Sequence, residues 1–148
     1  MSDLRELYQE VILDHHKHPR NFGPLPEGNQ HARGNNPLCG DRIVVHLKVN
    51  NGVIQDVRFE GAGCAISRAS ASLMTDAVKG KPVDQAERLF EEFHKLVTTG
   101  VDEEVEESLG KLNVFCGVRE FPSRVKCASL AWHTLHSALG DGKAASTE

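Results

Sequence analysis

Three of the four cysteines in this 148-residue chain occupy positions suited to metal binding or sulfur chemistry. Cys39 stands in the Pro/Gly turn of "NNPLCGDRI", two residues before Asp41 and an apolar run. Cys64 follows "GAG" and Cys127 follows "PSRVK", each at the predicted start of a helix. Unpaired N–H groups at a helix start carry partial positive charge, which stabilises a thiolate. The glycines before Cys64 also allow another group to approach the backbone closely.

Three interpretations of these cysteines stay open from the residues alone: buried small side chains, two disulfides, or ligands of one metal. We do not expect disulfides, because cysteines grouped in a protein of a reducing compartment lean toward metal binding or catalysis. The spacing is not a local CxxC pair, so the pattern makes a metal site plausible and no more. Cys116, in "NVFCGVREF", has no acidic partner and no clear helix start, and we assign it to packing.

Histidines gather at two places, and a metal site is the functional alternative at each. The run "HHKH", which contains His15, His16 and His18, closes the first predicted helix, where exposed histidines suit the helix dipole. His133 and His136 share a helix face, and we expect surface polar residues there. The acidic run "VDEEVEESLG" is expected to be a solvated helix face or loop.

Two basic residues precede Cys127 closely enough to act on it. Arg124 and Lys126 lie within three residues of this cysteine and can stabilise a thiolate or a persulfide by charge. Solvent exposure of both side chains is the simpler alternative, and it is at least as well supported for Lys126.

The composition fits one soluble domain in a reducing compartment. A chain of 148 residues can bury roughly two-thirds of the surface that its unfolded form exposes, so folding needs neither metal nor disulfide. The net charge of −4 argues against nucleic acid or an anionic membrane as a main partner. No apolar run approaches the roughly 18 residues of a membrane span, and the first residues lack a signal-peptide layout. We expect a cytoplasmic protein.

Periodicity predicts the elements that must position the cysteines. A helix with one buried face is predicted from apolar residues at helical spacing: Leu4, Leu7, Tyr8, Val11 and Ile12. The segment 19–37 is rich in Pro, Gly and Asn and predicts a long loop. Strands over 43–49 and 53–60 are joined by Asn51-Gly52, a favoured hairpin pair. In the second strand we expect Val53, Val57 and Phe59 to share the apolar face.

Three helices are predicted after this hairpin. The first starts at Cys64 and ends near Gly80, and the second lies between Pro82 and Gly100. The third follows "PSRVK", and its apolar face carries Cys127, Ala131, Leu135 and Ala138. We therefore predict an α+β fold, with a small antiparallel sheet packed against several helices. It forms one domain over 1–140, followed by a flexible tail at 141–148.

Four segments together resemble the U-type iron–sulfur assembly proteins, the IscU/SufU family with its NifU N-terminal-like domain. They are "LYQEVILDHHKHPRNFG", "NPLCGDRI", "FEGAGCAISRASASLM" and "FPSRVKCASLAW". The likeness runs in order over nearly the whole chain and is closest to the SufU branch. The long stretch between Cys64 and Cys127 and the segment "GVREFPSRVKCA" are typical of that branch. Lys126 stands where IscU proteins carry a histidine, and "FPSRVK" replaces their "LPPVK" segment.

This resemblance implies a SufE/NifU-like fold and one tetrahedral site formed by Cys39, Asp41, Cys64 and Cys127. It implies Zn²⁺ there, since zinc accepts thiolate and carboxylate ligands together. Iron or a transient iron–sulfur cluster at the same residues is the alternative. By the same resemblance Cys39 is the sulfur acceptor, and Arg124 is a candidate stabiliser of a thiolate.

Three functions are then in competition. The first is a zinc-binding sulfur acceptor, in enzyme terms a zinc-dependent sulfurtransferase, that takes persulfide sulfur from a SufS-type cysteine desulfurase. The second is a scaffold on which a [2Fe-2S] cluster is built and passed to carrier or recipient proteins. The third is a structural zinc module, which the length of the chain disfavours because its folding should not need zinc. We favour the first.

Overall fold

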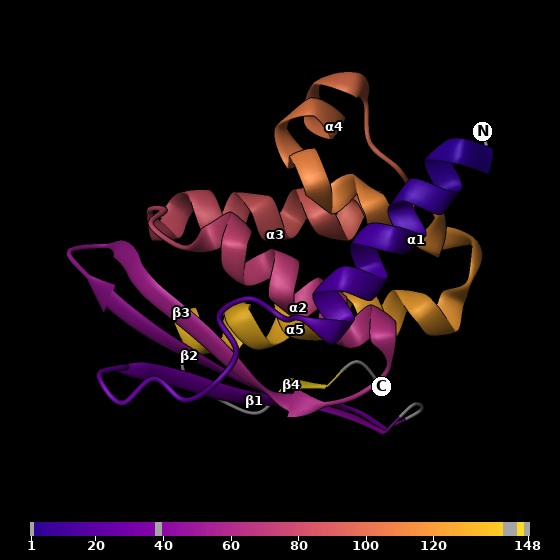
Figure 1. Ribbon diagram of the computed structural model, residues 1–148. Helices are drawn as coiled ribbons and strands as arrows, with labels where there is room; N and C mark the ends of the chain where they lie inside the picture. Colours follow the sequence, from indigo (N-terminus) through magenta and orange to yellow (C-terminus); the bar gives the residue numbers. More distant parts are fainter. Residues whose placement is uncertain (1, 38–39, 141–144, 147–148) are drawn as a thin grey trace.

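A computed structural model describes residues 2–37, 40–140 and 145–146 of the chain. In chain order the elements are α1 (Ser2–Lys17), β1 (Gln30–Asn36), β2 (Asp41–Asn50), β3 (Val53–Ala62), α2 (Ala65–Val78), α3 (Val83–Thr98), α4 (Glu103–Leu109), the 3₁₀ segment η1 (Gly110–Glu120), α5 (Pro122–Leu139) and β4 (Ala145–Ser146). The helices gather on one face of a single sheet (Figure 1). This arrangement confirms the predicted α+β class. No helix in these ranges is long and apolar enough to cross a membrane.

The hairpin of β2 and β3 forms where the sequence predicts it. Asn51 and Gly52 both adopt positive φ, at 54° and 75°, as a tight two-residue turn requires. The pairing jumps from Lys48–Asp56 to Val49–Ile54, which leaves one extra residue on β3. This bulge reverses the side-chain alternation beyond it. Ile54 is therefore fully buried and Val53 only half-buried, so the expected apolar face was wrong at that position.

The segment predicted as one long loop ends in a strand. β1 pairs antiparallel with β2 along its whole length, and the strand order is β3-β2-β1-β4. Its inner positions are Ala32, Gly34 and Asn36, all buried. Small or polar residues occupy them because α5 lies close: a methyl group at Gly34 would overlap Thr134 Oγ1 and sit 3.1 Å from Leu130 Cδ1. A hydrophobic alternation is absent, so the sequence pattern did not reveal the strand.

Helices α2 and α5 lie between the sheet and the remaining helices (Figure 1). The predicted inner face of α5 is confirmed, since Cys127, Ala131, Leu135 and Ala138 are all buried. Trp132 on its other side stacks on Phe93 of α3, with ring centroids 4.8 Å apart. The core is thus built here from apolar residues at helical spacing.

The ends of the predicted elements are mostly where expected. α2 ends just before Gly80, and α3 lies between Pro82 and Gly100. The acidic run forms α4, whose glutamates are exposed as predicted. The short strand β4, parallel to β1, was not predicted. The other residues of the expected flexible tail lie outside the described ranges, so that expectation stays a prediction.

Candidate metal centre

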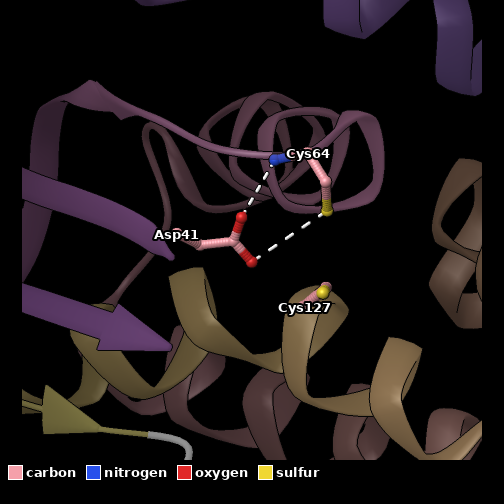
Figure 2. Close-up of side chains that lie close together, drawn as sticks. All are labelled: Asp41, Cys64 and Cys127. Atoms are coloured by element: carbon pink, nitrogen blue, oxygen red, sulfur yellow. Dashed lines mark hydrogen bonds between the residues drawn. The ribbon is translucent and has the colours of Figure 1, made fainter. Parts of the chain in front are cut away.

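Asp41 is the first residue of β2 and is fully buried. Its Oδ1 accepts a hydrogen bond from the backbone N–H of Cys64 at 2.9 Å. Its Oδ2 lies 4.0 Å from Cys64 Sγ (Figure 2). One oxygen is thus occupied by the backbone, and the other faces sulfur.

Gly63 makes this approach possible. A Cβ atom at that position would lie only 2.6 Å from Asp41 Oδ1 and 3.1 Å from its carboxyl carbon. The sequence predicted that the glycines before Cys64 admit a close neighbour, and the neighbour is the Asp41 carboxylate. The two motifs "CGD" and "GAGC" therefore meet through contacts of Asp41 with the backbone N–H and the sulfur of Cys64, which the absence of a side chain at Gly63 permits.

Cys64 caps the N-terminus of α2, as predicted. Its backbone is extended, with φ −70° and ψ 169°, and its Sγ accepts from the N–H of Ser67 at 3.5 Å. The first N–H groups of a helix lack backbone acceptors and carry partial positive charge. The sulfur of Cys64 therefore lies where helix N–H groups point, a position suited to a metal ligand.

Cys127 differs from the prediction that it begins a helix. α5 begins at Pro122, so Cys127 lies in its second turn, where the backbone N–H groups are already bonded within the helix. Its Sγ is 3.6 Å from the carbonyl oxygen of Ser123, and the residue is fully buried. The helix-start argument for its thiolate therefore fails. Its place in the site comes instead from the packing of α5 on α2, where Ser70 Oγ donates to Ala128 O at 2.6 Å.

Asn36, the last residue of β1, completes the surroundings and was missed by the sequence analysis. It is fully buried, and its Nδ2 lies 3.3 Å from Asp41 Oδ2 and 3.6 Å from Cys127 Sγ. It thus donates toward both a carboxylate and a sulfur. Its Oδ1 is buried without a hydrogen-bond partner among the residues that the structure describes. Recognising β1 as a strand would have placed Asn36 on the inner face.

Three side chains converge on one point. One ligand atom each from Asp41, Cys64 and Cys127 lie within 4.8 Å of one another (Figure 2). The donors are two sulfurs and one carboxylate oxygen, a set that fits Zn²⁺, which binds both kinds of ligand. The elements that carry them are far apart in sequence, so the first residue of β2 and the helices α2 and α5 build the site together.

The other predicted site residues stand as follows. Cys39 lies outside the described residues, so its part in the site stays a prediction. Arg124 is exposed in the first turn of α5, and its action on a thiolate also stays a prediction. Cys116 is half-buried in η1 and packs against the core, in agreement with its assignment to packing.

Some of the histidines are less exposed than predicted, whereas His18 is exposed as expected. His15 is buried, and its Nδ1 lies 2.7 Å from Ser72 Oγ of α2. Burial, with the positive charge of Arg20 as a lesser cause, lowers the pKa of His15. The expectation of an exposed run was wrong here, although the helical spacing from Val11 and Ile12 places His15 on the buried face. His133 is half-buried and its pKa is lowered by burial, while His136 is exposed as expected.

Comparisons with known proteins show the family of this chain. A family model described as the NifU-like N-terminal domain matches residues 7–144. The zinc-dependent sulfurtransferase SufU of Bacillus subtilis is 41% identical over 138 residues, covering 93% of this chain and 92% of that protein. The iron–sulfur cluster assembly scaffold protein IscU of Streptococcus pyogenes is 41% identical over 139 residues, covering 94% and 86%.

Solved structures show the same fold. One from Fervidobacterium islandicum, described as an iron–sulfur cluster assembly scaffold protein for the SUF system, has a TM-score of 0.82 at 34% identity, covering 88% of this chain and 94% of that one. The N-terminal part of a NifU-like protein from Brucella abortus has a TM-score of 0.78, covering 89% of this chain and 91% of that one. The chain belongs to the family of NifU-like N-terminal domains, among the SufU and IscU proteins.

Proposed function

We propose that this protein works in iron–sulfur cluster assembly as a zinc-binding sulfur acceptor, which takes persulfide sulfur from a cysteine desulfurase. The observation that carries the proposal is the convergence of Asp41, Cys64 and Cys127. The similarity to a relative named as a zinc-dependent sulfurtransferase supports it. The proposal sets the protein in the reducing cytoplasm, with a SufS-type desulfurase and iron–sulfur carrier or recipient proteins as partners.

Asp41, Cys64 and Cys127 would hold the zinc, with Cys39 as the proposed fourth ligand. Bound zinc would keep these thiols deprotonated near neutral pH. The chain itself prepares Asp41 for this role, because Cys64 N–H fixes Oδ1 and leaves Oδ2 turned toward the sulfurs. Asn36 also donates to Asp41 Oδ2 through its Nδ2.

The transfer itself would take place at Cys39. Its thiolate attacks the sulfane sulfur of the desulfurase persulfide, a new S–S bond forms, and the desulfurase cysteine leaves as a thiolate. Cys39 then carries the persulfide, and no net oxidation or reduction occurs. Arg124 is the proposed source of positive charge near the persulfide.

A cluster scaffold is the second candidate, and the similarity to a relative named as a scaffold IscU favours it. Thiolates of the same residues could ligate iron. A structural zinc module is less well supported, because the hydrophobic core is a large cluster of apolar residues that includes neither Asp41 nor Cys64.

One experiment separates the first two. The anaerobic protein is mixed with its cognate desulfurase and cysteine, without iron, and the intact mass is measured. The acceptor function predicts one added sulfur atom on Cys39 and a faster desulfurase, both lost in Cys39→Ser and both kept in Cys116→Ser. If turnover rises only with iron and the product is a bound cluster, the protein is a scaffold, and Cys39, Cys64 and Cys127 are equally needed.

A further inference from the structure

A histidine pair lies on the face of the sheet that the helices leave open. His31 of β1 and His46 of β2 are direct partners in the antiparallel register. Both alternate with buried neighbours, so both side chains are on the outer face. Their Nδ1 atoms lie 2.7 Å apart. A contact this short between two imidazole nitrogens needs one proton between them, because one nitrogen donates and the other accepts.

Glu60 of β3 decides which nitrogen of His46 is free. Its Oε2 lies 2.8 Å from His46 Nε2. An ionised carboxylate only accepts, so Nε2 carries a proton. In the neutral ring the lone pair is then on Nδ1, directed at His31. A carboxylate that holds the far nitrogen of a histidine in this way is the usual support of a metal-ligating histidine.

We propose that His31 Nδ1 and His46 Nδ1 form a second metal site, for a divalent ion of tetragonal preference such as Ni²⁺ or Cu²⁺. Glu60 is the positioning residue, and water fills the remaining coordination positions. On binding, the proton on His31 Nδ1 moves to its Nε2 by way of solvent, and both rings stay neutral. His31 is exposed and can turn to do this, while the His46 side chain is only 15% exposed and is held by Glu60.

The donor set indicates the class of metal. The pair offers two imidazole nitrogens, with water for the remaining coordination positions and no thiolate. Nitrogen and oxygen donors of this kind suit tetragonal Cu²⁺ and Ni²⁺ sites, whereas sets that contain sulfur favour Zn²⁺. The histidine pair therefore prefers a different class of metal ion from the one preferred by Asp41, Cys64 and Cys127.

The charges around the pair limit its affinity for metal. Arg58 is the register partner of His46, and Arg33 lies two residues beyond His31 on the same face. These cations repel a dication, and the carboxylate of Glu60 offsets part of that repulsion. We therefore expect the pair to bind metal more weakly than the thiolate centre formed by Asp41, Cys64 and Cys127.

The test uses the untagged full chain with one equivalent of zinc bound. Ni²⁺ is titrated at pH 7.5 by calorimetry, and bound nickel and zinc are counted after gel filtration. We expect one nickel in addition to the zinc. Binding should weaken at least tenfold in His31→Ala and in His46→Ala, and about tenfold in Glu60→Gln, the lower end of the range for lost support of a ligand. His136→Ala is the control, since this exposed histidine also contacts a glutamate, Glu87, and should change nothing.

Several results would overturn the proposal. Nickel bound equally well by His31→Ala and His46→Ala would place it elsewhere. Nickel that replaces zinc one for one would place it at the thiolate centre. Added Zn²⁺ that occupies the pair as tightly as Ni²⁺ would refute the assignment of metal class. Cu²⁺ bound at the pair should give an axial electron paramagnetic resonance spectrum with nitrogen couplings, and sulfur ligation in that spectrum would contradict the site.

Discussion

Replacing Gly63 by alanine tests the contact between the two motifs more directly than removing a ligand. The added methyl group would lie 2.6 Å from Asp41 Oδ1, while ordinary contacts begin at 3.4 Å. The carboxylate must therefore retreat by about 0.8 Å, the difference between these distances. The backbone of Gly63 is not in the left-handed region, so alanine brings no strain of its own.

The expected loss of zinc affinity follows from the hydrogen bond that Gly63→Ala would stretch. The hydrogen bond from Cys64 N–H to Asp41 Oδ1 is 2.9 Å long, and a retreat of this size would take it beyond hydrogen-bond range. A hydrogen bond to a charged group contributes about 1.5–3 kcal/mol. If all of it is lost from the metal-bound state, zinc affinity falls by roughly ten- to a hundredfold. Relaxation of the loop brings the effect toward the lower figure.

The assay is zinc transfer from the protein to a chromophoric chelator, followed as affinity and as rate. Gly117→Ala is the matched control, because a methyl group there meets nothing within 4 Å and Gly117 also lacks a left-handed backbone. We expect weaker binding and faster transfer in Gly63→Ala alone, together with a lower melting temperature of the metal-free protein, because the same hydrogen bond is lost there. Equal affinities in the two variants would show that the position of Asp41 does not matter to the metal, and the proposed ligand set would be wrong.

The remaining predictions concern the same site, the sheet and the buried histidine. Asp41→Ala should keep zinc on the cysteines but exchange it faster, and unchanged binding in a chelator assay would remove Asp41 from the ligands. Chelation of the metal should leave the hairpin over 43–60 protected in hydrogen exchange, whereas complete loss of the circular-dichroism signal would favour a structural zinc. Gly34→Ala should lower the free energy of unfolding by about 1–3 kcal/mol, measured in urea, through overlap with Thr134 Oγ1. Adding Thr134→Ala should restore part of the loss, and purely additive effects would contradict the overlap. The pKa of His15 is lowered by burial, so the unfolded chain binds its proton more readily. The free energy of unfolding should therefore be highest above about pH 6.5 and should fall as the pH drops below it. His15→Asn should flatten the pH profile of the melting temperature.

The pairing of a carboxylate with thiolates has a physical consequence for sulfur transfer. Zinc binds the softer sulfur donors and the harder oxygen donor together, and the carboxylate is the ligand most easily exchanged for another group. Asn36 and Cys64 N–H would hold Asp41 in place if the carboxylate were displaced from the proposed zinc ion. The proposed acceptor can therefore open its coordination shell without losing the ligand from the site.

Local chemistry determined much of this fold from the sequence by itself. The Asn51-Gly52 turn, the start of α3 after Pro82 and the helix-capping place of Cys64 depend on residues that are neighbours in the chain. Short-range preferences of this kind act in any tertiary context, since they come from backbone sterics and local hydrogen bonds. The motifs around Cys64 and Cys127 likewise indicate the resemblance to the IscU/SufU family from the sequence, without any knowledge of tertiary contacts.

Which polar and small residues are buried depends on the tertiary structure. β1 has no apolar alternation, and it is a strand because Gly34 lets α5 approach and because β2 pairs with it. Asn36 and His15 are buried through partners on distant elements, Asp41 and Ser72, which no local pattern indicates. The same holds for the three converging ligands, because a contact between residues far apart in sequence depends on how whole elements pack. Periodicity reports which face of an element is buried, and packing alone decides what that face meets.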